Sequence, residues 1–318
     1  MMKICIILPP FFFNPDSQGF NEMLASEMVA VCESSADVSV CKEFPQNEAD
    51  IFIMTVQYRE DVLSEWMQKS IMRCKQLGGI VMVAGKASSV EFAYILKRCG
   101  ADFVFLGETE ETLSDLLSLS IPLDIPKLKS VDGLAYIEKD SVKYRLRKRE
   151  ETLDDYPIPQ YRYLEEGKKI YPLCVMETCR SCHGKCNFCE GYLFRRQNLG
   201  DTYRVKSPER VVEEIENVIK TYNCRLFSFS DDNFFADGNR GIERAEQIAK
   251  RLIEKKIKMR FTIECRADDI MPDSMALLKK AGLYKVFVGI ESGSQDVLNR
   301  YNKGISVEQN HQAIKTLN

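Results

Sequence analysis

Three cysteines stand close together near the middle of the chain. Cys182, Cys186 and Cys189 are separated by three and then by two residues. Thiolates at this spacing can turn inward from one short loop and bind three irons of a cubic iron–sulfur cluster, which leaves the fourth iron open to another ligand. A structural zinc ion would need a fourth protein ligand, for which Cys179 or His183 would have to serve. The spacing therefore favours an iron–sulfur cluster over zinc.

The composition is that of an ordinary globular protein, with no signal for nucleic-acid or membrane binding. The 318 residues are enough for two domains, and their formal net charge of −3 provides no broad basic surface for a nucleic acid. No apolar run approaches the roughly 18 residues that a membrane-spanning helix needs. Residues 1–10 run into prolines without a small-residue cleavage site, so we interpret them as a first strand and not as a signal peptide.

The chain contains 12 cysteines, which is a high number. Five of them crowd into residues 174–189, and the others are scattered among apolar neighbours. In a chain of this length without a secretory segment, clustered cysteines indicate a metal site and not a disulfide framework. We therefore expect a reducing compartment, the cytoplasm.

Residues 1–120 alternate short apolar stretches with helical ones. Residues 4–8 and 51–56 are typical of strands buried on both faces, and Gly78 and Gly79 end a helical stretch before another strand. Strands that alternate with helices predict a doubly wound parallel sheet. Ligands of such sheets bind beyond the carboxyl ends of the strands. The candidate binding residues at those ends are Thr55, Gly85, Ser88, Gly107 and Glu108.

Residues 121–170 are predicted to be a linker, because prolines mark its ends and two alternating stretches within it form a β-hairpin. Residues 171–318 then contain four strand–helix units. Polar residues follow each strand, which is where α/β barrels place their catalytic groups. These residues are, in chain order, the cysteine loop, Asp231 and Asp232, Glu264 and Arg266, and Glu291 and Ser292.

Taken together, the motifs resemble those of the radical S-adenosylmethionine (SAM) superfamily, in the group that has a cobalamin-binding domain. The resemblance rests on the cysteine motif with Phe188 before its last cysteine, and on the runs F-S-F-S-D-D-N-F-F, C-R-A-D-D-I and V-G-I-E-S-G-S-Q-D-V-L-N-R-Y-N-K-G. In the first half it rests on G-G-I-V-M-V-A-G-K and C-G-A-D-F-V-F-L-G-E-T-E-E-T-L. It implies a Rossmann-like, cobalamin-binding-type domain over residues 1–120 and a radical SAM (β/α) barrel over residues 171–318.

The resemblance also implies roles for individual residues. The cluster would be a [4Fe–4S] cluster on Cys182, Cys186 and Cys189. Phe188 would contact the adenine of SAM. Asp231 and Asp232 would hold its methionyl amino group. Its carboxylate and ribose would meet Arg266, Glu291 and Ser292. Cobalamin would lie against the five residues at the strand ends of the first domain.

The implied reaction begins with reductive cleavage of SAM to a 5′-deoxyadenosyl radical, which takes a hydrogen atom from an unactivated carbon. With cobalamin also bound, we expect an enzyme that methylates this carbon. Two alternatives remain: a radical SAM enzyme with an empty cobalamin-like domain that performs rearrangement or cyclisation, and a non-catalytic iron–sulfur-binding fragment. The expected partners are a small-molecule or peptide substrate and a reductant such as flavodoxin or ferredoxin.

The chain departs from the pattern of this family in three places. His183 and His311 both lie outside residues 1–120, so no histidine of the first domain can bind cobalt. The link over residues 40–51 has no room for the usual second helix. Family barrels have six strands, whereas this sequence provides about four, so we expect a truncated barrel. Its exposed strand edge would cause self-association or be covered by a partner that completes the barrel.

Overall fold

The structure is a computed structural model, and it describes residues 1–10, 15–42, 44–164, 173–180, 182–189, 191, 194, 198–199, 203–236 and 238–318. Tyr171, where the second domain was predicted to start, lies outside these residues. Contacts divide the chain into two units. Unit 1 consists of Met1–Arg149, Tyr156–Gln160 and Leu193–Gly200, and unit 2 consists of Glu150–Asp155, Tyr161–Tyr192 and Asp201–Asn318. Within the described ranges, no helix combines the length and the apolar character needed to cross a bilayer.

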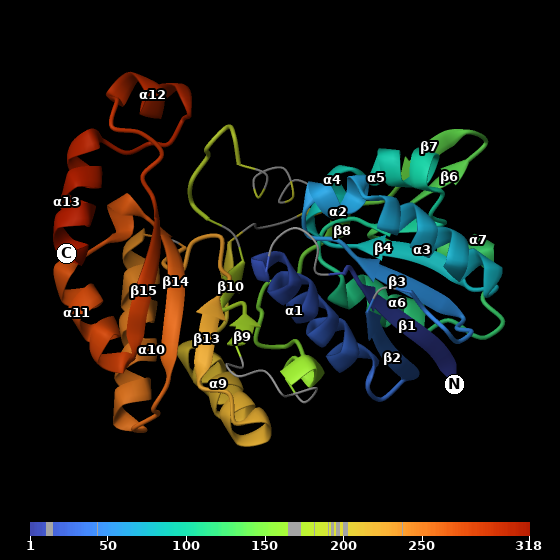
Figure 1. Ribbon diagram of the computed structural model, residues 1–318, viewed down its shortest axis with the longest axis horizontal. Coiled ribbons are helices and arrows are strands. Elements are labelled where there is room, and N and C mark those ends of the chain that lie inside the picture. The colour runs from blue at the N-terminus through green and yellow to red at the C-terminus, as the bar shows by residue number, and fades with distance from the viewer. Residues whose placement is uncertain are drawn as a thin grey trace. The chain divides into compact units, whose positions relative to one another are not determined.

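Unit 1, blue to green in Figure 1, is built on one sheet with the strand order β2-β1-β3-β4-β5-β6-β7. Strands β1 to β5 are parallel and have the bounds Met2–Leu8, Ala36–Lys42, Ile51–Thr55, Ile80–Ala84 and Phe103–Phe105. Strand β2 lies on one side of β1, and the chain then crosses to the other side of β1 to add β3, β4 and β5. This change of direction in the strand order is typical of doubly wound sheets. The parallel α/β fold predicted for the first half is therefore confirmed.

The hairpin predicted for the linker belongs to this same sheet. Strand β6 (Leu134–Glu138) pairs antiparallel with β5, and β7 (Ser141–Tyr144) pairs antiparallel with β6. The hairpin thereby covers the edge of β5, which would otherwise present unpaired backbone groups to solvent. Unit 1 consequently extends to Arg149, beyond the boundary expected at residue 120.

Helices cover both faces of this sheet because side chains alternate along each buried strand. In β1, Ile4 and Ile6 pack into one core together with α1 (Pro15–Cys32) and α6 (Glu110–Leu117). Ile7 packs into the other core, with α3 (Glu65–Gln76) and the π-helix η1 (Ile95–Cys99). Figure 1 shows α1 and α3 on opposite sides of the strands. Shorter helices of the unit are α2 (Arg59–Leu63), α4 (Lys86–Val90), α5 (Phe92–Tyr94) and α7 (Ile125–Leu128).

Unit 2, yellow-green to red in Figure 1, contains a four-stranded parallel sheet in the order β15-β14-β13-β9. Each strand lies beside the strand that precedes it in this sheet. The strand bounds are Leu173–Met176 for β9, Leu226–Phe229 for β13, Arg260–Arg266 for β14 and Leu283–Gly289 for β15. The helices are α9 (Pro208–Tyr222), α10 (Gly238–Glu254), α11 (Pro272–Ala281), α12 (Gln295–Arg300) and α13 (Val307–Leu317).

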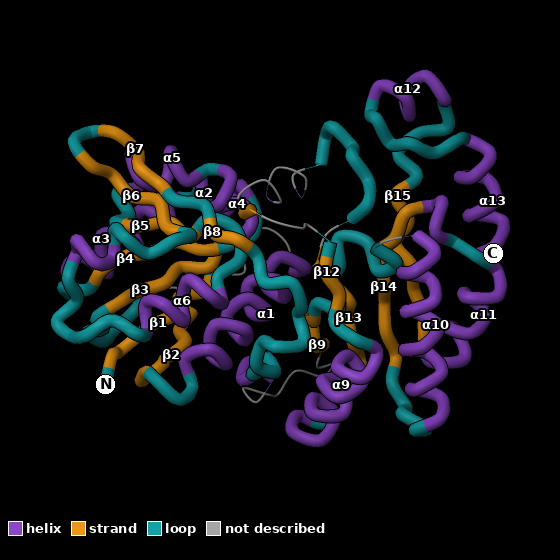
Figure 2. The backbone as a smooth tube through the Cα atoms, turned by 180° about the vertical axis from the view of Figure 1, so that it is seen from behind, coloured by secondary structure: helices purple, strands orange, loops and turns teal. Residues whose placement is uncertain are grey.

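The two faces of the unit 2 sheet differ in polarity. Phe227 and Phe261 are buried in a core shared with α9, α10 and α11, and Figure 2 shows α10 and α11 running along one side of the sheet. The alternate residues Ser228, Thr262 and Glu264 are less buried, and the Thr262 hydroxyl lies 3.1 Å from that of Ser228. One face is thus a helix-covered core, and the other is less covered and carries polar residues together with apolar ones such as Phe287, which is in register with Glu264.

Short elements complete the fold. Strand β10 (Cys179–Arg180) pairs antiparallel with β12 (Arg204–Val205), and β8 (Arg147–Lys148) pairs parallel with β11 (Asn198–Leu199). Two 3-10 turns, η2 (Arg162–Leu164) and η3 (Ala267–Asp269), lie in unit 2.

Gly85, one of the candidate binding residues, has a backbone that only glycine adopts easily. It lies between β4 and α4 with φ 128° and ψ 177°, and a Cβ added there would overlap the carbonyl group of Val56. We expect Gly85→Ala to lower the free energy of unfolding by about 3 kcal/mol, near the upper end for such strain. Urea unfolding of the full chain, followed by circular dichroism, measures this loss.

Gly100→Ala is the matched control. Gly100 also has a positive φ, of 83°, but a Cβ there would meet no atom within 4 Å. Backbone strain alone predicts a loss of about 1 kcal/mol. Equal losses for the two variants would show that the close approach of Gly85 to Val56 is unimportant.

Candidate functional site

The three-cysteine loop follows β9 at the carboxyl edge of the unit 2 sheet. Cys186 is buried, and Cys182 and Cys189 are half-buried. The Cys182 sulfur accepts a hydrogen bond from the backbone N–H of Gly184 at 3.3 Å, and the Cys186 sulfur accepts one from Arg266 Nη1 at 3.8 Å. Such donors stabilise the thiolate form that metal ligation requires.

The sulfurs of this loop are not gathered as they would be around a single tetrahedral ion. Ligands at 2.3 Å from zinc lie about 3.8 Å from one another. In the part of the chain that the structure describes, only His183, Asp268 and Asp269 form a group of three potential ligands within 4.8 Å of one another. The clustered cysteines all lie in that part. Among the described residues, the cysteines of the loop are thus not part of any such compact group of three ligands.

Cys179, the other candidate for a zinc ligand, is fully buried. Its Sγ–H donates to the backbone carbonyl of Asn233 at 3.3 Å. Burial, together with the nearby carboxylate of Asp231, raises the pKa of this thiol well above its usual value. Cys179 is therefore a protonated, packed thiol.

The far side of the cysteine loop docks on the segment that follows α12. The backbone N–H of Asn187 donates to the carbonyl of Tyr301 at 3.1 Å, and Asn302 Nδ2 donates to the carbonyl of Lys185 at 2.8 Å. The rings of Phe188 and Tyr301 meet edge to face, with centroids 5.1 Å apart. Residues about 115 positions apart in sequence are thereby joined, which fixes this side of the loop.

The two adjacent aspartates after β13 lie in different environments. Asp231 is fully buried: its Oδ1 accepts from the backbone N–H groups of Thr178 at 2.6 Å and Cys179 at 2.8 Å, and its Oδ2 accepts from the Thr178 hydroxyl at 2.6 Å. Burial raises the pKa of the Asp231 carboxyl to about 6, although the hydrogen bond from the Thr178 side chain and the charge of Arg244 lower it.

Asp232, by contrast, is exposed. Its carboxylate oxygen Oδ2 and the Cys189 sulfur both lie 3.4 Å from the position that a Cβ on Gly191 would take. The side chain of Asp232 is therefore beside the cysteine loop, on its accessible side.

Arg266, at the end of β14, has partners within the chain for all of its side-chain nitrogens. Its Nε and Nη2 donate to the two oxygens of Asp268 at 2.9 and 3.0 Å, and Nη2 also donates to the carbonyl of Lys303 at 2.8 Å. Its Nη1 makes the contact with Cys186. The bidentate pair with Asp268 holds the guanidinium group beside the cysteine loop.

The loop after β15 contains a residue in an unfavourable backbone conformation. Glu291 has a φ of 59°, and it accepts a hydrogen bond from Lys303 Nζ at 2.9 Å. Asn310 Nδ2 holds the loop by donating to the carbonyls of Ile290 and Ser292, both at 3.0 Å. Left-handed conformations of residues other than glycine occur preferentially at functional sites. This feature makes Glu291 and Ser292 stronger site candidates than their sequence positions did.

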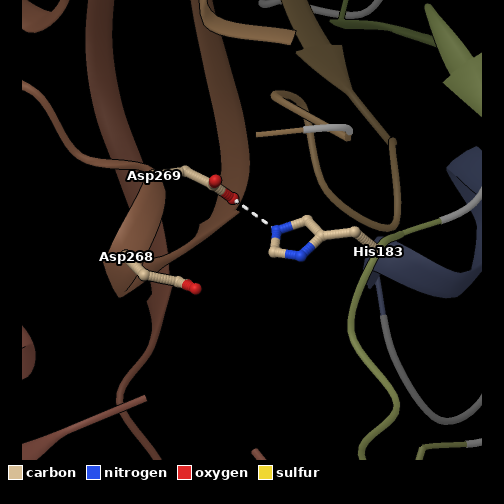
Figure 3. A group of neighbouring side chains, drawn as sticks. All are labelled: His183, Asp268 and Asp269. Atoms are coloured by element: carbon tan, nitrogen blue, oxygen red, sulfur yellow. Dashed lines mark hydrogen bonds and ion pairs between the residues drawn. The ribbon is translucent and has the colours of Figure 1, made fainter. Parts of the chain in front are cut away.

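His183 and two aspartates form the group shown in Figure 3. His183 Nε2 lies 3.3 Å from Asp269 Oδ2, which also accepts from Asn233 Nδ2 at 2.8 Å. Asp268 is engaged by Arg266. Because these carboxylates are already paired, the group is a hydrogen-bonded network that ties the cysteine loop to η3.

Several of these supporting residues were not predicted from the sequence. Asp269 and Asn233 lie within the sequence motifs described above but carried no signal of their contacts, and nothing in the sequence around Asn310 indicated that its amide is buried. Thr178 lies four residues before the first cysteine of the motif, and that position was the available hint.

In unit 1 the candidate binding residues lie at the carboxyl ends of β3, β4 and β5. Thr55 is fully buried with its hydroxyl 3.4 Å from the Ile7 carbonyl, and the Ser88 hydroxyl donates to the Gly85 carbonyl at 2.9 Å. Both side chains therefore stabilise the sheet edge itself. Glu108 pairs with Arg149 at 3.4 Å.

Ser89, which the sequence analysis did not single out, joins two of these loops. Its hydroxyl lies within donating distance of the carbonyls of Gly85 at 2.8 Å and Phe105 at 3.1 Å, and it accepts from the N–H of Gly107 at 3.0 Å. The loops after β4 and β5 are thus held together by one buried side chain.

Comparison with known proteins identifies the second half of the chain. Residues 176–318 match the family described as the radical SAM superfamily. An uncharacterized methyltransferase of Pyrococcus horikoshii is 31% identical over 220 residues, which cover 68% of this chain and 46% of that protein. The anaerobic magnesium-protoporphyrin IX monomethyl ester cyclase of Rubrivivax gelatinosus is 28% identical over 252 residues, which cover 75% of this chain and 43% of the cyclase.

Solved structures share the fold of nearly the whole chain. The cobalamin-dependent SAM radical enzyme OxsB, with aqua-cobalamin and SAM bound, superposes with a TM-score of 0.78 at 21% identity over 99% of this chain and 47% of OxsB. The radical SAM methyltransferase TsrM of Kitasatospora setae superposes with a TM-score of 0.78 at 14% identity over 99% of this chain and 65% of TsrM. This chain spans about half the length of the curated relatives described above.

The sequence match includes the cysteine loop and continues through β13, β14 and β15, the strands whose carboxyl ends carry the other polar residues of the site. Residues 176–318 of this chain therefore belong to the radical SAM superfamily.

Proposed function

We propose that this chain binds a [4Fe–4S] cluster and SAM and carries out radical chemistry on an unactivated carbon. The observation that carries the proposal is the cysteine loop. Two of its three thiols, those of Cys182 and Cys186, receive hydrogen-bond donors, and the loop lies within the region that matches the superfamily. Three thiolates of one loop can bind three irons of a cubic cluster and leave the fourth iron open to SAM.

When bound, the cluster and SAM supply reductive cleavage of the SAM carbon–sulfur bond to a 5′-deoxyadenosyl radical. The residues of this chain hold and orient the two groups. Cys182, Cys186 and Cys189 bind the cluster as thiolates. Phe188, with 49% of its surface exposed, offers its ring to the adenine, and Asp232 offers an accessible carboxylate to the methionyl amino group.

The carboxylate and ribose of SAM remain assigned to the ends of β14 and β15. Arg266 is held there beside Cys186 with all of its side-chain nitrogens engaged, so it would reach SAM by exchanging one of these partners. Glu291 and Ser292 lie in the loop that Asn310 fixes. Asp231 is left out of the SAM-binding set because its side chain is fully buried and both of its oxygens have partners.

Methyl transfer with cobalamin is the reaction that we favour. The support is the doubly wound sheet of unit 1, whose candidate residues line the carboxyl ends of β3 to β5, and the likeness to proteins named as cobalamin-dependent or as methyltransferases. The similarity to the magnesium-protoporphyrin cyclase favours cyclisation as the second candidate. A small-molecule or peptide substrate and a flavodoxin- or ferredoxin-type reductant complete the proposed reaction.

We also propose that unit 2 is part of a (β/α) barrel and that a further polypeptide strand adds to β15. Within the described residues β15 pairs with β14 on one side and with no strand on the other. Phe287 is 63% exposed on this strand, and a groove of about 830 Å³ lies beside its start, lined by residues that include Leu283 and Leu317. Unpaired strands with exposed apolar side chains associate readily with other chains.

The cluster assignment predicts which cysteines retain iron. Anaerobic reconstitution should give a brown protein with about four irons per chain. Cys182→Ala, Cys186→Ala or Cys189→Ala should abolish the colour, because each removes a ligand. Cys174→Ala and Cys179→Ala are the matched controls and should keep it, since both thiols are buried and the Cys179 thiol is bonded to the Asn233 carbonyl.

Two measurements decide between this function and the alternatives. Iron and sulfide analysis reports the cluster, and chromatography after addition of dithionite and SAM reports 5′-deoxyadenosine. Stoichiometric zinc bound by sulfur would contradict the cluster. A full cluster without any 5′-deoxyadenosine would support the non-catalytic fragment.

The cobalamin assignment predicts a corrinoid without a histidine ligand from unit 1. Residues 1–149 contain no histidine. If unit 1 binds cobalamin, hydroxocobalamin should bind at micromolar concentration. Because unit 1 offers no histidine, electron paramagnetic resonance of the reduced, paramagnetic form should lack splitting from a protein nitrogen. Equilibrium dialysis measures the binding. Failure to bind would exclude methyl transfer through cobalamin and favour the empty-domain alternative.

The exposed edge of β15 predicts self-association. Phe287→Lys should lower the average mass in light scattering, because a charge on an edge strand opposes further pairing. Met72→Lys, at a residue that is 58% exposed on α3 of unit 1, is the control and should have no effect. A wild-type protein that is monomeric at all concentrations tested would refute the proposal.

A further inference from the structure

We propose that Asp231 is a positioning residue that holds the beginning of the three-cysteine loop through Thr178 and Cys179, and that it does not contact SAM. The inference rests on the proposed function in one respect, namely that the loop is the cluster site. Asp231 and Asp232, which both follow β13 directly, thereby have different roles: Asp231 positions the loop, and Asp232 is the candidate SAM ligand.

The contacts of Asp231 continue the hydrogen bonding of the sheet beyond its last rung. The ladder between β13 and β9 ends with the N–H of Ser230, which donates to the carbonyl of Met176 at 2.9 Å. Beyond this point β9 turns away into the cysteine loop. The Asp231 carboxylate then accepts from the next amides, those of Thr178 and Cys179. A side chain thus replaces backbone pairing where the two strands separate.

Thr178 is held from the opposite side as well. Its carbonyl accepts from Arg244 Nη2 at 2.6 Å and from the backbone N–H of Lys206 at 3.0 Å. Arg244 Nε also donates to the carbonyl of Lys206 at 2.8 Å. The N–H, the hydroxyl and the carbonyl of Thr178 therefore all have partners, and Thr178 and Asp231 are fully buried. Its backbone can leave this position only by breaking several buried hydrogen bonds.

This anchor acts on the cluster ligands because the first of them, Cys182, follows Thr178 closely in sequence. The later part of the loop is fixed separately, by the contacts of Asn187 with Tyr301 and of Lys185 with Asn302. Without Asp231 the far end would stay held, whereas the beginning would keep only its contacts with Arg244, Lys206 and β12 and would become less well fixed. The three sulfurs would then lose their relative placement.

The role that we assign requires the shape of Asp231 and not its charge. An asparagine in its place keeps an oxygen that accepts from the Thr178 and Cys179 amides, and its NH₂ group can donate to the Thr178 hydroxyl. An alanine leaves those donors buried without an acceptor. If Asp231 instead bound the SAM ammonium group through its charge, both substitutions would weaken SAM binding alike, because both remove the charge.

The test compares the full chain with Asp231→Asn, Asp231→Ala and Asp232→Asn. Residue-resolved hydrogen exchange follows the Thr178 and Cys179 amides before any cluster is added. Iron content is then measured after anaerobic reconstitution, and electron paramagnetic resonance of the reduced protein is recorded with and without SAM. Circular dichroism establishes that each variant is folded.

Asp231→Ala should speed exchange at Thr178 and Cys179 by roughly tenfold or more, as expected for the loss of hydrogen bonds to a charged group. It should also lose most of its iron. Asp231→Asn should retain the protection, the iron and the spectral change on addition of SAM. Asp232→Asn should retain the protection and the iron but respond more weakly to SAM.

If Asp231→Ala fails to fold, Thr178→Val serves as the second variant, because it removes only the hydroxyl donor to Asp231. It should lose protection and iron in part, and Thr178→Ser, which keeps the hydroxyl, should restore both. Normal protection and iron in Asp231→Ala would overturn the proposal. So would an Asp231→Asn protein that keeps its cluster but no longer responds to SAM.

Failure of the proposed function has a different outcome. If the loop is not a cluster site, the wild-type chain takes up no iron. Hydrogen exchange at the Thr178 and Cys179 amides, compared between the wild type and Asp231→Ala, still shows whether Asp231 holds the loop.

Discussion

The arrangement of the candidate site depends on the buried carboxylate of Asp231. A parallel sheet holds its strands together through backbone hydrogen bonds, but a strand that turns into a ligand-bearing loop has to leave this ladder. In unit 2 that departure occurs between Met176 and Thr178, and the amides freed by it are taken up by one side chain. Burial strengthens these bonds because water cannot compete for the donors.

Positive and negative charges around the cysteine loop are arranged in pairs. Arg266 contacts the Cys186 sulfur while both oxygens of Asp268 hold it in place, and Lys303 pairs with Glu291 close by. Thiolates that bind a cluster carry negative charge, so a fixed cation beside them is favourable. The acidic partners keep the cations in position and limit the net charge that the site must bury. Asp232, beside the same loop, is exposed.

Much of this could be predicted from local sequence. The spacing of Cys182, Cys186 and Cys189 indicates its chemistry directly, because ligands this close in sequence are also close in space. The alternation of apolar strands with helices predicted parallel sheets in both halves, since a strand buried on both faces has few other ways to pack. The strand ends then located the polar residues at one edge of each sheet.

Contacts between distant segments decided the rest. Thr178 and Asp231 are 53 residues apart, and no local pattern distinguishes Asp231, which is buried, from the exposed Asp232 that follows it. The hairpin at β6 and β7 was recognised, but its place in the first sheet depended on β5 having an open edge. Side-chain direction and strand partners are set by which segments meet in the folded chain. Local sequence determines which interactions each residue is able to make. Contacts between distant segments in the folded chain determine which of these interactions it makes.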